Sequence, residues 1–191
     1  MNAQTLDQTI EAGIKTFDVD ASHSQVGFRV KHLGFSKVRG SFQEYDAVIT
    51  LDPTDLTTLA AEATIRTASI DTGSADRDAH LRSDDFFASD THPTMTFATT
   101  GVAVVEGEEF TIDGVLTIRD VTKPVVLRGR YQGTASDPWG NERVAVEART
   151  RVNRKEFGLV WNQVLETGGL LVSDEVEIVL EVEAIARATQ G

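Results

Sequence analysis

The sequence predicts an all-β protein of about eight antiparallel strands, arranged as a barrel or a sandwich, with short helical connections. Apolar and polar residues alternate along several segments, which is typical of strands with one buried face. Short breaks that suit hairpin turns separate these segments, which favours antiparallel neighbours. The length of 191 residues, 40% of them hydrophobic, indicates one globular domain with a sizeable core.

The strands differ in how clearly they alternate. The clearest segments are Ser24–Lys31, Glu109–Ile118, Arg143–Val152 and Glu175–Ala184. Weaker strands are expected at Phe35–Leu51, Glu62–Ile70, Thr94–Val105 and Val125–Ala135. Turns are expected around Gly107, which can adopt a positive φ, and at Asp137–Asn141, which contains both proline and glycine.

Two interruptions are expected to be helical. Asp52–Asp55 predicts a short turn of helix, with a proline near its first position. Ser74–Phe87 predicts a longer helical connection that Ser74 caps and that closes one mouth of the barrel. Its two terminal phenylalanines, Phe86 and Phe87, should face apolar surroundings. Residues 1–16 are expected to form an N-terminal extension with a loose helix, and residues 17–187 the barrel domain.

Charge and composition limit the function. The net charge of −12 repels phosphate backbones and anionic headgroups, which disfavours nucleic-acid binding and electrostatic membrane docking. The absence of cysteine excludes disulfides and thiolate chemistry. We find neither a secretory signal pattern nor an apolar run of roughly 18 residues that could span a membrane. With Met1 at the start, a cytoplasmic protein is expected; a periplasmic or secreted one would follow if a leader had been removed.

Several ordered motifs carry more specific information. The most specific is I-D-T-G-S-A-D-R-D-A-H-L-R-S-D-D-F-F, followed by H-P-T-M-T-F. The others are F-D-V-D-A-S-H-S-Q-V-G-F-R-V-K-H, G-F-S-K-V-R-G-S-F, G-V-L-T-I-R-D-V-T-K-P-V and V-N-R-K-E-F-G-L. Together they resemble the YceI-like family of polyisoprenoid-binding proteins, from about Phe17 to Ala184. Asp120 departs from the family, which often has glycine there, and should affect only a turn.

The resemblance implies an eight-stranded antiparallel, lipocalin-like β-barrel that holds a polyisoprenoid or similar long lipid, often as a homodimer. Such a barrel has room for one slim ligand, and a buried alkyl chain gains about 0.8 kcal/mol per methylene. No cofactor and no metal is expected. The residues expected to bind the ligand are Val26, Phe28, Phe42, Ile65, Phe86, Met95, Phe97, Ile112, Leu116, Val146, Ile178 and Leu180.

Two other functions stay open. One is a structural or partner-binding barrel whose interior is filled by its own side chains. The other, less favoured, is an enzyme on a barrel scaffold. His23, His32 and His92 are scattered, and no nucleophile elbow or phosphate-binding glycine loop accompanies them, so no catalytic residue is expected.

Three smaller groups have two interpretations each. Asp76, Asp78 and His80 could bind a metal, but neighbouring Arg77 and Arg82 favour ion pairing or helix capping. The basic stretch, which comprises Arg149, Arg151, Arg154 and Lys155, could clamp a headgroup or pyrophosphate, but a solvated face is favoured. For Trp139 and Trp161, structural packing is favoured over ligand stacking.

Overall fold

A computed structural model describes residues 13–164, 166 and 170–188. Its strands are β1 (Lys15–Val19), β2 (Gln25–His32), β3 (Ser36–Phe42), β4 (Tyr45–Asp52), β5 (Asp55–Arg66), β6 (Ile70–Asp71), β7 (Thr94–Thr99), β8 (Val104–Glu106), β9 (Glu109–Ile118), β10 (Val121–Ser136), β11 (Glu142–Asn153) and β12 (Val172–Ala186). Helix α2 spans Ala75–Arg82, and two 3-10 helices span Thr67–Ser69 and Arg154–Phe157. The expected N-terminal helix lies mostly outside the described residues, and β1 begins within the expected extension.

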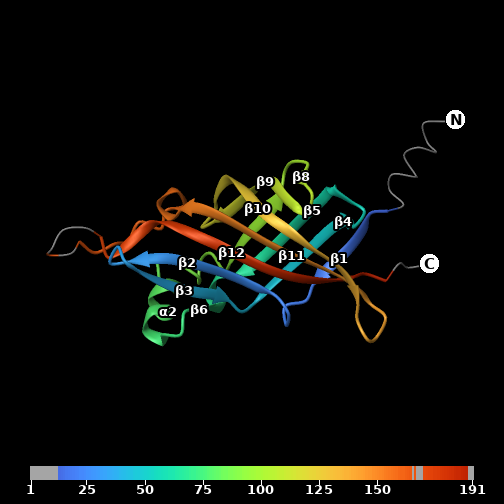
Figure 1. The fold of residues 1–191 in the computed structure, drawn as a ribbon. Coiled ribbons are helices and arrows are strands. Elements are labelled where there is room, and N and C mark those ends of the chain that lie inside the picture. The colour runs from blue at the N-terminus through green and yellow to red at the C-terminus, as the bar shows by residue number, and fades with distance from the viewer. Residues whose placement is uncertain (1–12, 165, 167–169, 189–191) are drawn as a thin grey trace.

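Eight antiparallel strands close into a barrel, as predicted (Figure 1). Their order around the wall is β1, β4, β5, β7, β9, β10, β11 and β12, and β12 returns to pair with β1. The end of β12 pairs with β1, whereas its long first part pairs with β2. Strands β1 and β2 therefore act as one wall strand with a break between them, and the β2–β3 hairpin lengthens the barrel at one end.

Three of the expected strands are wrong as single strands. Glu62–Ile70 is interrupted, because β5 ends at Arg66 and a 3-10 helix at Thr67–Ser69 separates it from β6. Phe35–Leu51 is divided at Gln43 and Glu44 into β3 and β4, which have different neighbours. No glycine or proline marks this break, so local turn chemistry gives no sign of it. Thr94–Val105 is likewise divided into β7 and β8. Strand β1 was not among the segments expected from alternation, because five residues are too few to display a period clearly.

The short helix expected at Asp52–Asp55 is also wrong. Asp52 and Asp55 face each other as the last pair of the β4–β5 hairpin, and the two residues between them form the turn. The carboxylate of Asp52 accepts hydrogen bonds from the backbone N–H of Thr54 at 2.9 Å and from its hydroxyl at 2.7 Å. Aspartate often closes turns in this way, and the bonds compete with helix formation.

The segment 74–87 contains a helix, but α2 ends at Arg82. Ser74 occupies the N-cap position without making the expected side-chain bond. The helix is held instead by the buried carboxylate of Asp78, which accepts bonds from the backbone N–H of Thr72 at 2.9 Å and from its hydroxyl at 2.5 Å. Phe86 is 7% exposed and Phe87 packs against the same hydrophobic cluster, so the prediction of apolar surroundings is confirmed.

Two hydrophobic clusters lie inside the barrel, one toward each end. The cluster near β1 contains side chains that are 1% exposed or less, among them Phe17, Leu51 and Val144. The other cluster lies beside α2 and joins strand residues to Phe86 and Phe157. Phe97 packs against both clusters and so marks the middle of the barrel.

Candidate functional site

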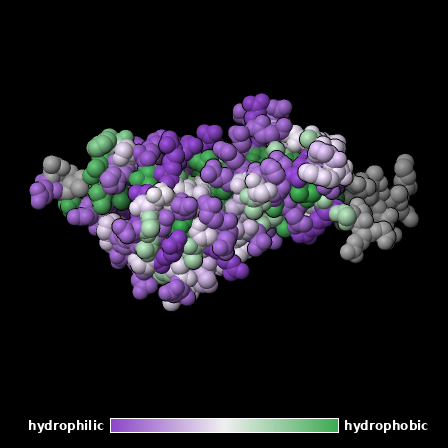
Figure 2. Space-filling view, turned by 90° about the horizontal axis from the view of Figure 1, so that it is seen from below, coloured by the Kyte–Doolittle hydropathy of each residue, from purple (hydrophilic) through white to green (hydrophobic). Residues whose placement is uncertain are grey.

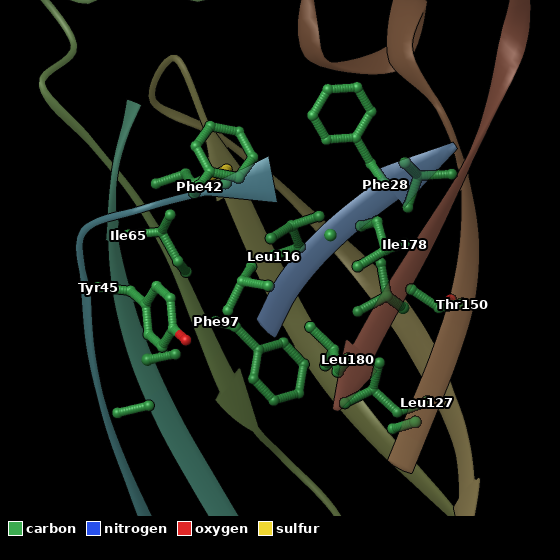
Figure 3. A pocket seen from close by; sticks show the side chains of 18 of the residues that line it. Phe28, Phe42, Tyr45, Ile65, Phe97, Leu116, Leu127, Thr150, Ile178 and Leu180 are labelled. Carbon is green, nitrogen blue, oxygen red and sulfur yellow. The ribbon is translucent and has the colours of Figure 1, made fainter. Parts of the chain in front are cut away.

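The barrel interior contains an apolar cavity of about 240 Å³. All twelve residues predicted from alternation and motif line it: Val26, Phe28, Phe42, Ile65, Phe86, Met95, Phe97, Ile112, Leu116, Val146, Ile178 and Leu180. Figure 3 shows side chains from facing walls, such as Phe97, Leu116 and Ile178, directed toward one common space. Whether each of the twelve contacts a ligand stays a prediction.

The cavity is long rather than round. On β12 alone its lining runs from Val172 to Val182. Ten residue steps correspond to roughly 30 Å along a twisted strand, or roughly 23 Å along the axis of a barrel with strands tilted by about 40°. This shape suits a chain-like molecule better than a compact one.

The two ends of the barrel differ. At the β1 end, Phe17, Leu51, Val144 and Ala184 are almost completely buried and do not line the cavity, so they plug that end. At the other end, the lining includes Val30 and Val172, which are only partly buried. We refer to this second end, where β2 ends and β12 begins, as the mouth.

Three phenylalanine rings lie close against the wall, each over a glycine. Phe28 pairs with Gly40 and Phe110 with Gly129 on neighbouring strands, and a Cβ atom at either glycine would collide with the ring. Phe97 lies over Gly114 on β9, where a Cβ atom would come within 2.5 Å of the ring. The missing side chains let the rings lie against the sheet, so the lumen stays open.

The YceI-like domain model matches residues 17–184. The chain belongs to the YceI-like family. A UPF0312 protein of Pectobacterium carotovorum subsp. carotovorum is 39% identical over 169 residues, which cover 88% of this chain and 84% of that protein. The YceI protein of Campylobacter jejuni has 33% identity and a TM-score of 0.72, over 88% of this chain and 96% of that structure.

The fold extends further than the sequence similarity. A polyisoprenoid binding domain from Saccharophagus degradans has 16% identity and a TM-score of 0.66, over 90% of this chain and 98% of that structure. At this identity the comparison shows a shared fold alone. The cavity of this chain therefore lies inside a YceI-like barrel.

The sequence prediction missed the polar groups of this YceI-like cavity. Tyr45, Thr150 and Arg154 line it beside the apolar residues. The signal was present, because Thr150 and Arg154 continue the inward alternation of β11 after Ala148. The hydroxyl of Tyr45 donates to the carbonyl of Ser24 at 2.8 Å, and burial raises the pKa of this phenol.

Arg154 is the charged residue that lies deepest at the mouth, with 5% of its surface exposed. Its guanidinium donates to the carbonyls of Leu159 at 2.6 Å, Trp161 at 2.8 Å and Ser173 at 3.0 Å. Burial lowers its pKa, against the opposing effect of Asp174 at 3.5 Å. Arg154 thus holds together the two chain segments that border the mouth.

The structure divides the basic stretch. Arg149 and Arg151 face outward as the alternation predicts, and Arg151 lies 3.6 Å from the carboxylate of Glu175. Lys155 pairs with Asp174 at 2.9 Å. These contacts agree with the prediction that the basic stretch is a solvated face and not a headgroup clamp. Arg154 is buried, so the prediction was wrong for this residue.

The D-x-D-x-H residues do not converge on one point. Asp78 is bound to Thr72, and the Nε2 atom of His80 lies 2.9 Å from Asp85. The flanking arginines do not pair with these acids either, because Arg77 donates to Thr72 and Arg82 to the carbonyl of Ile70. The geometry favours a structural role in anchoring α2.

A second acidic group, Asp20, His23 and Glu183, has ligand atoms close enough to hold a cation. The guanidinium of Arg143 already occupies its centre, donating to Asp20 at 2.9 Å and to Glu183. A divalent metal there would be repelled by the arginine. Ser22 and Asp20 both approach the same Nδ1 atom of His23, whereas a catalytic triad uses opposite ring nitrogens.

The two tryptophans differ. Trp161 packs against His80 and Phe86, with ring centroids 4.7 and 5.4 Å away, which agrees with a packing role. Trp139 is 81% exposed in the β10–β11 turn, so packing was the wrong prediction for it.

Asp120 lies in the β9–β10 turn as expected, with φ of 63°, and pairs with His92 at 3.1 Å.

No helix among the described residues is both long and apolar enough to span a membrane.

Proposed function

We propose that this YceI-like barrel binds one long apolar chain of the isoprenoid type in its interior, as a carrier or storage protein. The observation that carries the proposal is the long cavity between the plugged end and the mouth, lined almost entirely by apolar side chains. Each methylene transferred from water to such a lining contributes about 0.8 kcal/mol, so a long chain can bind tightly without any charged contact.

The choice of an isoprenoid rests on the fold. The Saccharophagus degradans domain, described as polyisoprenoid binding, has the same barrel. The polar end of the ligand should lie at the mouth, because the other end is plugged by Phe17 and Leu51. Arg154 is bound to three carbonyls, so it should border the ligand rather than neutralise a headgroup.

The cavity also weighs against the alternative of a barrel filled by its own side chains, since 240 Å³ of the interior is open. A binding protein is favoured over an enzyme by the family and by the polyisoprenoid binding domain that shares its fold. A homodimer, expected from the resemblance, is compatible with this function, and light scattering of the purified protein would measure it.

Native mass spectrometry of the purified protein tests the proposal. We expect discrete added masses that disappear after organic extraction, and extracted chains that contain isoprene repeats. Protein stripped of lipid should take up polyprenyl chains delivered in ethanol, with a rise in melting temperature because the ligand binds only the folded state. Protein that carries no lipid and takes up none would contradict the proposal.

A further inference from the structure

The β2–β3 hairpin differs in charge from the rest of the chain. All thirty acidic residues lie outside residues 21–43, although the chain as a whole carries a net charge of −12. Within this stretch the hairpin contains four cationic residues: Arg29, Lys31, Lys37 and Arg39. One wall of the mouth is therefore locally basic on an acidic molecule.

The register places these cations in pairs of like charge. Arg29 lies opposite Arg39, and Lys31 lies opposite Lys37. Their side chains point away from the cavity, because Phe28 and Val30 alternate with them and line it. Like charges directly opposite each other destabilise an antiparallel pair. Within the described residues, Arg29 alone has an acidic partner, Glu177 at 3.8 Å. The arrangement therefore costs stability.

The tip of this hairpin is apolar. Phe35 is 82% exposed and Leu33 is 36% exposed. Leu33 also has a φ of 54°, a left-handed conformation that is unfavourable for a residue with a side chain. Folding alone therefore gives no reason for a large apolar residue at either position.

A second apolar segment lies beside the tip. The backbone N–H of Leu33 donates to the carbonyl of Leu171 at 2.9 Å, and Leu170 is bridged to Val164. Val164 is 74% exposed and Leu170 is 41% exposed. We define the mouth patch as Leu33, Phe35, Val164 and Leu170. Figure 2 shows hydrophobic atoms gathered at the left end of the molecule, where Figure 1 places the β2–β3 hairpin and the start of β12.

The mouth patch is continuous with the cavity. Val30 lines the cavity three residues before Leu33, and Val172 lines it two residues after Leu170. His32 and Val172 are paired across the two strands, so both segments belong to one rim. Apolar surface thus continues from the lumen to the outside, with the four cations beside it.

We propose that the mouth patch and its four cations dock the barrel on an anionic lipid bilayer, so that a lipid passes between bilayer and cavity without crossing water. Exposed aromatic residues flanked by lysines are typical of segments that lie in the membrane interface. The purpose of the docking rests on the proposed function, although the docking itself requires no ligand. The whole-chain charge disfavours membrane contact in general, but all thirty acidic residues lie outside residues 21–43, so the hairpin is the part of this end that an anionic bilayer attracts.

A bilayer fits this surface better than a second copy of the chain. A symmetric contact through the tip would bring the two sets of cations toward each other, and like charges repel. An anionic surface instead complements all four, and each cation near such a surface strengthens binding about fivefold. The apolar tip adds attraction that salt does not screen.

Co-sedimentation with vesicles tests the proposal. Wild type should bind vesicles of phosphatidylcholine mixed with phosphatidylglycerol, bind pure phosphatidylcholine vesicles much more weakly, and lose affinity as salt is raised. Phe35→Ser should weaken binding roughly tenfold or more, from the loss of one inserted aromatic side chain. Replacing Lys31, Lys37 and Arg39 together by glutamine should weaken binding to the anionic vesicles by about fivefold per charge and reduce its salt dependence.

Matched controls separate position from composition. Trp139→Ser removes an equally exposed aromatic residue at the plugged end, and replacing the exposed Arg66, Arg128 and Arg149 by glutamine removes three cations from another part of the outer wall. Both control variants should bind the anionic vesicles like wild type. Equal losses in test and control variants, or no preference of wild type for anionic vesicles, would overturn the proposal.

Light scattering and lipid uptake distinguish docking on a bilayer from self-association and from lipid binding in the cavity. If light scattering shows that Phe35→Ser converts a dimer to a monomer while vesicle binding is unchanged, the tip is a contact between copies and the proposal is wrong. Uptake of polyprenyl chains delivered in ethanol should be intact in Phe35→Ser, since the cavity is unaltered. If wild type takes up no chain yet binds anionic vesicles through Phe35, the proposed ligand fails while the docking surface stands.

Discussion

At the scale of single residues, glycine determines how wide the lumen is. A methyl group at Gly114 would lie 2.5 Å from the ring of Phe97 and 2.8 Å from the carbonyl of Ala98. We expect Gly114→Ala to push the ring into the lumen, lower lipid uptake and destabilise the fold by about 1–3 kcal/mol. Gly101→Ala is the control, because its methyl would meet Asp113 at an ordinary 3.5 Å. Uptake assays and thermal melts check this; unchanged uptake by Gly114→Ala would show that the ring does not limit the lumen.

The second residue-scale prediction concerns a charge in the middle of the cavity. Phe97→Glu should abolish lipid binding while the protein still folds. In an empty barrel water can reach the carboxylate, whereas a bound chain would remove that water at a cost of several kcal/mol. Val126→Glu is the control, since Val126 is 38% exposed on the outer wall. Lipid extraction and melts measure both variants, and a folded Phe97→Glu protein that binds like wild type would place the ligand elsewhere.

At the scale of elements, helix α2 depends on one buried carboxylate. Asp78→Ala leaves the N–H and hydroxyl of Thr72 without their acceptor, so we expect a loss of about 1–3 kcal/mol in the free energy of unfolding. Asp76→Ala, exposed on the same helix, should cost less than about 1 kcal/mol. Denaturant unfolding measures both. Equal losses would mean that Asp78 acts only through its charge near the helix N-terminus.

At the scale of the whole molecule, one ionic cluster joins three parts of the plugged end. Arg143 on β11 contacts Asp20 after β1, Asp137 before β11 and Glu183 on β12. Bonds from Asn141 and, to a smaller extent, Arg143 lower the pKa of Asp137 to about 2. Bonds from Ser22, then Arg143 and His23, lower the pKa of Asp20.

Acid should destabilise the fold through these two carboxyl groups, because their pKa values are lowered in the folded state. A carboxyl group whose pKa is lower in the folded state stabilises the fold above its usual value of 3.8, and this stability is lost as the pH falls toward about 2. We expect the melting temperature to be steady above about pH 5 and to fall below pH 4. Arg143→Met should lower the melting temperature at pH 7 and make the acid decline shallower. Arg130→Met, which loses only an exposed pair with Glu108, is the control; identical acid profiles of wild type and Arg143→Met would contradict the assignment.

The sequence by itself determined which residues face inward. Alternation is a local property, because successive side chains of a strand point to opposite faces whatever the strand pairs with. The strands around Phe28, Leu116 and Ile178 were therefore predicted with their inward faces, and the family motifs indicated the barrel and the block that contains Phe86. Where alternation was short or turn signals were absent, as at β1 and the break at Gln43, the local pattern failed.

Only the tertiary structure decided how these faces combine. The Phe97–Gly114 contact, the plug at Phe17 and the position of the mouth all depend on the register between strands distant in the sequence. The same holds for Arg154, whose buried charge is acceptable because three carbonyls from two other segments meet it. It also holds for Lys31 and Lys37, which become a cationic pair only across the hairpin. Register is set by the total energy of packing and pairing over the closed sheet, which no single stretch of sequence contains.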